Sequence, residues 1–306
     1  MNTAGKIVLL LPTAIAVDLA AASDRSFTKT GEKAHFIHGD NVVPAQQHVP
    51  AGQERKALTL AQRAEGMSAV MVTPDGVVSE ARMDPQTLLI FEQAVREMER
   101  RGGAPDMPAS ALTAADLAGE GMLAPQTVIG TDNRTQVTAT TTAPNRNIGR
   151  IASGCTGTLI TPKHVLTAGH CVSNGAGSFY SSLNFSAGRN GSSYPYGTTS
   201  WANVVTTSGW HNSGDFNHDY ALITLSSAPH GGFSGYGTYA SGGTFRIAGY
   251  PGDKPTGTMW QHTGTVSTSG SNRLCYTIDT AGGQSGSGIT SNAGATVRGV
   301  HTTGSS

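Results

Sequence analysis

The stretch CTGTLITPKHVLTAGHCV, residues 155–172, decides the expected fold class. It contains two short runs, 155–160 and 164–167, with Thr-Pro-Lys between them. Short runs rich in β-branched side chains and bounded by turn residues are typical of strands. The same texture continues after residue 127, where runs such as 221–225 and 245–248 are separated by Gly, Ser, Asn and Pro. We therefore expect an all-β domain, a barrel or a sandwich, and no repeat of 20 to 50 residues favours a propeller.

Charge is distributed unevenly along the 306-residue chain. The net charge is zero and 13% of the residues are charged, which favours neither nucleic acid nor an anionic membrane as a partner. Residues 1–126 hold 15 of the 20 acidic residues, and residues 127–306 hold the other 5. This break in composition predicts two parts with different roles.

The N-terminus has the pattern of a secretory signal peptide, residues 1–22. Lys6 precedes a largely apolar run, 7–17, which is too short to span a bilayer and is followed by Ala20-Ala21-Ala22 as a cleavage site. Asp18 at the end of that run leaves an uncleaved N-terminus as the alternative. We expect a secreted, extracellular protein with no membrane association after signal cleavage.

Residues 23–126 carry helical signals. Asp84-Pro85 is suited to the N-cap and first position of a helix, and apolar residues then recur on one face. These residues are Leu88, Phe91, Val95 and Met98. Arg100-Arg101 and two glycines end the pattern, and GGAPDMPAS at 102–110 follows as a hinge.

Three short motifs in the β-rich part carry potential chemistry: TAGHC with His170, NHDYALITL with Asp219 and GGQSGSG with Ser285. A serine hydroxyl becomes a nucleophile when a neutral imidazole takes its proton, and a buried carboxylate can hold that imidazole in one tautomer. The N–H groups of Gly283 and Ser285 could hold the resulting oxyanion. Taken alone, the Gly/Ser-rich motif is equally consistent with a flexible turn.

Together the motifs resemble the chymotrypsin-like serine peptidases, which have the same chain order of His, Asp and Ser. The resemblance implies a double β-barrel with the site between the barrels, and a disulfide from Cys171 back to Cys155. It places the triad aspartate at the head of an apolar strand, which fits Asp219, whereas Asp215 is better interpreted as a solvated turn residue. No metal or other cofactor is implied.

Residues 127–301 further resemble the secreted glutamyl endopeptidases of Bacillus type, relatives of the staphylococcal V8 protease. The motifs that carry this resemblance are TVIGTDNRTQVT at 127–138, CTGTLITPKHVLTAGHCV at 155–172, GYPGDKPTGTMWQHTG at 249–264, DTAGGQSGSG at 279–288 and GVHT at 299–302. The resemblance implies an endopeptidase that cleaves proteins or peptides after Glu, less readily after Asp, through an acyl-enzyme. We expect it to be a monomer.

Asp279 lies six residues before Ser285, where trypsin keeps the carboxylate that attracts Lys and Arg. Trypsin-like cleavage after basic residues is therefore an alternative. The resemblance instead assigns recognition of the substrate carboxylate to His301 and Thr280. A histidine and a hydroxyl can both donate hydrogen bonds to a carboxylate, although a packed core histidine is the alternative for His301.

Glutamate is confined to the first part of the chain. All eight glutamates precede residue 127, whereas about ten more would be expected in the rest on ordinary usage. They are Glu32, Glu54, Glu65, Glu80, Glu92, Glu97, Glu99 and Glu120. A peptidase that cleaves after Glu would digest itself less without them, although a generally charge-poor domain would show the same pattern.

Gln284 predicts an activation route unlike that of chymotrypsin, in which an aspartate before the serine pairs with the newly formed N-terminal ammonium. A glutamine cannot form that ion pair. We expect residues 23–126 to be a propeptide that partners its own peptidase domain, with Thr127 or Val128 as the mature N-terminus near the pocket. A separate binding domain that is retained is the alternative.

The chain departs from the glutamyl endopeptidases in two respects. It stops five residues after His301, whereas members continue with a strand and a helix, so the domain 127–306 is expected to be truncated at its C-terminus. Gly288 replaces the usual proline after SGS, which should loosen the turn. Cys275 has no partner in the implied pairing, so we expect it to be buried. A non-catalytic binding module with this fold is the remaining alternative.

Overall fold

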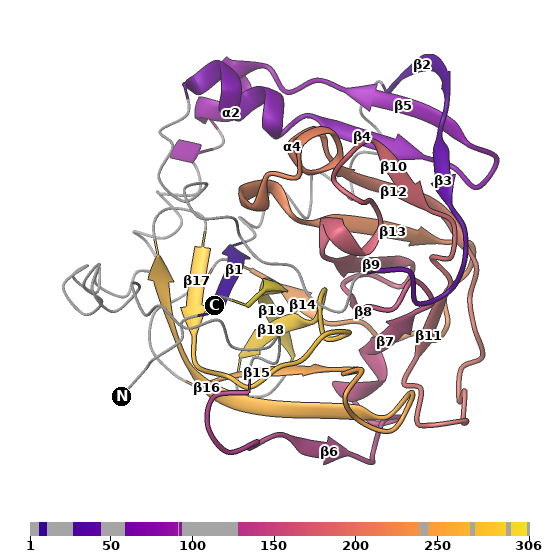
Figure 1. Ribbon diagram of the computed structural model, residues 1–306, viewed down its shortest axis with the longest axis vertical. Helices are drawn as coiled ribbons and strands as arrows, with labels where there is room; N and C mark the ends of the chain where they lie inside the picture. Colours follow the sequence, from indigo (N-terminus) through magenta and orange to yellow (C-terminus); the bar gives the residue numbers. More distant parts are fainter. Residues whose placement is uncertain are drawn as a thin grey trace.

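The computed structural model describes residues 6–10, 27–43, 59–90, 92–93, 128–237, 239, 244–269, 273–291 and 295–304. The strands form two large sheets whose strand pairs are nearly all antiparallel (Figure 1). This arrangement confirms the expected all-β class with two packed barrel-like sheets. No helix in the described ranges is long and apolar enough to cross a membrane.

The first sheet has nine strands in the order β11-β7-β8-β9-β13-β12-β4-β5-β2. The runs predicted at 155–160 and 164–167 form the adjacent strands β8 and β9, which pair antiparallel. The strands are β2 (Thr28–Lys33), β4 (Ala69–Val72), β5 (Val77–Ala81), β7 (Ile148–Ile151), β8 (Thr156–Leu159), β9 (His164–Thr167), β11 (Phe185–Ala187), β12 (Trp201–Thr207) and β13 (Ala221–Leu225).

The second sheet follows the order β1-β17-β16-β15-β18-β19-β14, with β6 on β16. Because β1 pairs with both β17 and β19, six of these strands form a closed ring. The strands are β1 (Lys6–Leu10), β6 (Thr135–Val137), β14 (Gly235–Tyr236), β15 (Thr244–Gly249), β16 (Met259–Ser269), β17 (Arg273–Tyr276), β18 (Gly288–Ser291) and β19 (Thr296–Thr303). The predicted signal peptide therefore contributes β1 in this structure.

The largest core cluster lies within the first sheet and includes Leu159, Leu166 and Leu222, each at most 1% exposed. Val297 and Val300 of β19 belong to the same cluster, so β19 packs against the first sheet while pairing in the second. A separate cluster around Ile247 and Ile278 fills the second sheet. The two sheets therefore meet along β19.

The described residues between 23 and 126 form both helices and strands. Helix α2 (Leu60–Gly66) begins with a capping box between Thr59 and Gln62. Residues 85–90 and 92–93 are also helical, and Asp84 accepts from the Thr87 N–H (2.9 Å), as predicted for its N-cap. The rest of the predicted helix and the hinge lie outside the described residues.

Sequence reasoning did not predict that this part adds strands to the first sheet. β4 pairs antiparallel with β12 along residues 69–72, and β5 and β2 extend the sheet further. A short strand β3 (His35–Ile37) also pairs in parallel with β10 (Ser178–Tyr180). The N-terminal part is thus hydrogen-bonded to the β-rich part rather than merely linked to it.

Candidate active site

His170 lies in the short 3-10 helix η5 (Gly169–Cys171), directly after β9, and is 1% exposed. Its backbone N–H donates to Asp219 Oδ1 (2.7 Å), and its ring Nδ1 lies 2.8 Å from Asp219 Oδ2. A carboxylate accepts, so Nδ1 carries the proton and Nε2 is left as an acceptor. Nε2 is buried and has no hydrogen-bond partner in the described part of the chain. The imidazole is therefore poised to accept a proton.

Asp219 is fully buried between the 3-10 helix η6 (Phe216–His218) and β13, at the head of the strand as expected. Asp215 instead caps η6, accepting from the Asn217 N–H (2.9 Å) and contacting His218 Nδ1 (3.0 Å). Burial opposes its ionisation, but the hydrogen bonds from His218 and Asn217 lower the pKa of Asp215 to about 2. The expectation of a turn residue is met, although Asp215 is paired and partly buried rather than solvated.

Trp210 of helix α4 (Ser208–Ser213) packs against the other side of this pair. Its ring meets that of His170 edge-on, with the centroids 5.9 Å apart, and its Nε1 donates to Ser173 O (2.9 Å). A Cβ at Gly169 would lie 2.8 Å from the Trp210 ring. Only glycine therefore fits before His170, a requirement that sequence reasoning did not identify.

Ser285 lies in the turn before β18, on the second sheet, and is 9% exposed. Its carbonyl accepts from Thr156 N of β8 (2.9 Å), so the turn is attached to the first sheet. Its Oγ lies 3.5 Å from Thr302 O rather than in a hydrogen bond to His170 Nε2. Such catalytic hydrogen bonds are often formed only when substrate binds.

The turn around Ser285 leaves two N–H groups available. Gly283 has φ +94°, and a Cβ there would lie 2.5 Å from Tyr250 O, so no other residue fits. Its carbonyl accepts from Thr156 Oγ1 (2.8 Å). Within the described residues, the N–H groups of Gly283 and Ser285 donate no hydrogen bond. They can accommodate the oxygen of an attacked carbonyl.

Asp279 is 1% exposed and its carboxylate is bonded within the chain. Oδ1 accepts from Ile129 N (2.9 Å) and Oδ2 from Asn133 N (3.0 Å), while His262 Nδ1 lies 3.4 Å from Oδ2. These contacts hold the segment 129–133 against the start of the nucleophile loop. A carboxylate committed in this way does not offer a free anion to a Lys or Arg side chain.

Thr280 and His301 are both buried, at 0% and 4% exposure. His301 lies on β19 beside the nucleophile turn, since its carbonyl accepts from Gly286 N (2.7 Å) and its N–H donates to Ser287 O (2.8 Å). Its ring Nδ1 lies 2.5 Å from Tyr276 Oη. The structure therefore places His301 next to Ser285 in the second sheet.

The chain resembles known peptidases over its second half. The sequence profile of the trypsin-like peptidase domain matches residues 155–300. A glutamyl endopeptidase of Bacillus licheniformis is 47% identical over 174 residues, which are 54% of each chain. A solved structure of a Glu endopeptidase in complex with MPD aligns with 35% identity and a TM-score of 0.53, covering 57% of this chain and 86% of that one. The chain belongs to the trypsin-like serine peptidases.

A second relative is named as a metalloprotease. An extracellular metalloprotease of Bacillus subtilis is 40% identical over 202 residues, which are 60% of this chain and 64% of that protein. The chain thus spans between half and two thirds of the length of these two curated relatives.

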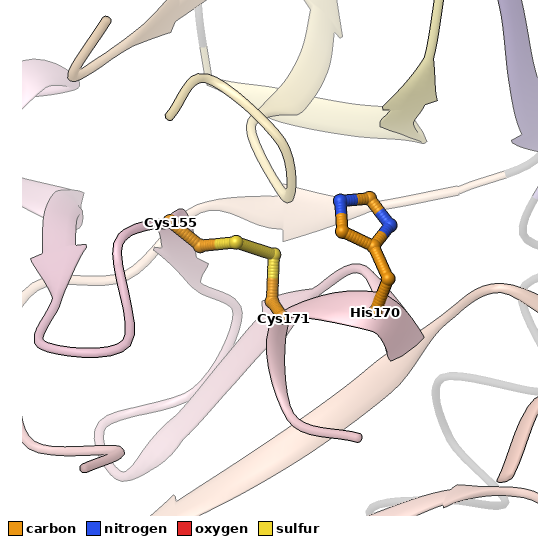
Figure 2. A group of neighbouring side chains, drawn as sticks. All are labelled: Cys155, His170 and Cys171. Atoms are coloured by element: carbon orange, nitrogen blue, oxygen red, sulfur yellow. A yellow bond between two sulfur atoms is a disulfide. The ribbon is translucent and has the colours of Figure 1, made fainter. Parts of the chain in front are cut away.

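One group of potential metal ligands lies near the site among the described residues, but its chemistry does not suit a metal ion. Cys155, His170 and Cys171 bring ligand atoms within 4.8 Å of one another. The two cysteines form the expected disulfide, which ties η5 back to the start of β8 (Figure 2). A disulfide has no thiolate to offer a metal, and Nδ1 of His170 is engaged by Asp219. The disulfide positions the peptidase histidine rather than a metal.

Proposed function

We propose that this chain is a serine endopeptidase that cleaves proteins or peptides on the carboxyl side of Glu, and less readily of Asp. The observation that carries the proposal is the arrangement of His170. Both oxygens of a buried carboxylate hold it, and its Nε2 is left without a partner in the described residues. The kinship with a protein named glutamyl endopeptidase supports the substrate class.

The reaction follows from these groups. Ser285 Oγ attacks the substrate carbonyl carbon while His170 Nε2 takes the hydroxyl proton, and the carbonyl π electrons move onto oxygen. The N–H groups of Gly283 and Ser285 stabilise that oxyanion. When the C–N bond breaks, His170 returns the proton to the leaving amine and an acyl-enzyme remains. Water then attacks the ester by the same route and regenerates Ser285.

The proposed pocket recognises a carboxylate through His301 and Thr280. Burial raises the pKa of Tyr276 well above its ordinary value, so its hydroxyl stays protonated and can donate to His301 Nδ1. That tautomer keeps a proton on Nε2, which can donate to the side chain of a substrate Glu. The commitment of Asp279 to residues 129 and 133 disfavours the trypsin-like alternative.

We also propose that residues 1–22 are a signal peptide, that residues 23–126 are a propeptide, and that the peptidase is secreted as a monomer. The Bacillus subtilis relative is named as an extracellular protein, which supports secretion. The pairing of β4 with β12 supports a propeptide that binds its own domain. Ile129 is bonded to Asp279, so a mature N-terminus at Thr127 or Val128 would begin next to the nucleophile loop.

A set of matched peptides tests this function. The peptides differ only in the residue before the scissile bond, which is Glu, Asp, Gln, Lys or Arg, and they are offered to the full chain and to Ser285→Ala. We expect cleavage after Glu, slower cleavage after Asp, and none by the variant. Cleavage mainly after Lys or Arg would contradict the pocket, and no cleavage of any peptide would favour a non-catalytic module.

N-terminal sequencing of secreted protein should find Thr127 or Val128, and a start near Ser23 would contradict the propeptide.

A further inference from the structure

Gln284, the residue before the nucleophile, is fully buried and holds the nucleophile turn closed. Its side-chain Oε1 accepts from Ala281 N (3.0 Å), and its own N–H donates to Ala281 O (3.0 Å). A third group reaches it from far along the chain, because Arg134 Nη1 lies 3.4 Å from Oε1. Two donors converge on the same oxygen, which fixes the orientation of the amide.

The side chain of Arg134 is fully buried and all five of its N–H groups have partners. Nε and Nη2 donate to Asp132 at 2.9 and 2.8 Å, and Nη1 and Nη2 donate to Asp253 at 3.0 and 2.5 Å. The remaining Nη1 hydrogen faces Gln284. Burial alone would lower the pKa of Arg134, but the hydrogen bonds to the two carboxylates raise it overall. The guanidinium is a permanent cation at the base of the nucleophile turn.

Asp253 connects this cation to the turn by a second route. The residue beside it, Gly252, donates its N–H to Gly282 O (2.7 Å). In a trans peptide the carbonyl and the N–H point in opposite directions, so fixing Gly282 O fixes the direction of the Gly283 N–H. Arg134 therefore acts on the turn both through a side chain, that of Gln284, and through a peptide plane.

We infer that Arg134 is a positioning residue that sets the oxyanion site of this peptidase, an inference that rests on the proposed function. Chymotrypsin uses an aspartate before the serine and a new N-terminal ammonium for this purpose. Here the cation is a side chain and the acceptor is an amide, and both are in place in the uncleaved chain. The planar guanidinium is essential, because the three N–H donors of a lysine cannot replace the five that Arg134 directs at two carboxylates and an amide.

Two variants test this inference, with a third as a matched control. Arg134→Lys keeps the charge and loses the fork, and Gln284→Met removes the acceptor while leaving the ion pairs intact. The control is Arg246→Lys, at another buried arginine on β15 whose Nη2 donates to Asn145 Oδ1 (2.7 Å), away from the turn. For each folded protein, kcat and KM are measured on a Glu peptide. Hydrogen exchange is measured at the backbone N–H groups of residues 281 and 284.

We expect Arg134→Lys to lower kcat about 100-fold with little change in KM, since one misplaced oxyanion donor costs that much. Exchange at the two amides should rise at least about tenfold in Arg134→Lys and in Gln284→Met, and stay unchanged in Arg246→Lys. Unchanged exchange in both test variants would overturn the inference, whether or not the protein cleaves peptides. Equal losses of kcat in Arg134→Lys and the control would also overturn it. Failure of wild type to cleave would count against the proposed function alone, because the exchange readout does not depend on catalysis.

Discussion

His170 and Asp219 lie on the first sheet and Ser285 lies on the second, and different kinds of contact hold the two halves. The histidine half is fixed by a disulfide and by one buried carboxylate within its own sheet. The serine half depends on the segment 129–134, which reaches the nucleophile loop through Asp279 and Arg134. That segment follows the predicted processing site directly. The serine half therefore depends on residues close to the proposed mature N-terminus, whereas the contacts that hold His170 all lie between residues 155 and 219.

The largest expected effect comes from breaking the histidine half. Asp219→Asn should lower kcat about 10⁴-fold, because an amide stabilises the wrong tautomer of His170. KM should change little and the protein should remain folded, as measured by steady-state kinetics and circular dichroism. The matched control is Asp215→Asn, four residues earlier, whose carboxylate contacts His218 rather than His170. An equal loss of kcat in both variants would contradict the assignment of Asp219.

A smaller effect is expected from loosening the serine half. Asp279→Asn replaces a charged acceptor of the Ile129 and Asn133 N–H groups by a neutral one. Hydrogen bonds to charged groups contribute about 1.5 to 3 kcal/mol, so urea unfolding should show a loss of that order. The preference for Glu should be retained. A variant of unchanged stability that had lost cleavage after Lys would instead assign Asp279 to the pocket.

The smallest effect is a pH dependence in the histidine half. The pKa of Asp215 is lowered from 3.8 to about 2 in the folded protein. The ionised Asp215 carboxylate therefore stabilises the folded state fully above pH 3.8, and this contribution is lost as the pH falls to about 2. It amounts to at most about 2 kcal/mol. Urea midpoints between pH 5 and pH 2 should fall more for wild type than for Asp215→Asn. Parallel curves would show that this ion pair contributes nothing.

Local sequence pattern together with the family resemblance predicted the parts of the histidine half. The strands β8 and β9 were predicted from their composition, and the resemblance to chymotrypsin-like peptidases supplied the pairing of Cys155 with Cys171. Both cysteines and His170 fall between residues 155 and 171, so the contacts that join them are local in the sequence. The N-cap at Asp84 was likewise readable, because capping depends on neighbouring residues only.

The supports of the serine half could not be predicted in this way. Asp279 and Arg134 act across about 150 residues of sequence, and nothing in a local motif indicates which backbone N–H a buried carboxylate will accept. The strands β4 and β5 were missed for a related reason. They are only four and five residues long, and pairing with β12 decides their conformation.

Labelling with phosphonate inhibitors tests whether Ser285 is the nucleophile of a site selective for Glu. Two diphenyl phosphonates that differ only in a Glu or a Lys side chain are incubated with the peptidase, and peptide mapping by mass spectrometry locates the adduct. We expect rapid labelling of Ser285 by the Glu phosphonate and little by the Lys phosphonate. Faster labelling by the Lys phosphonate, or an adduct on a residue other than Ser285, would contradict it.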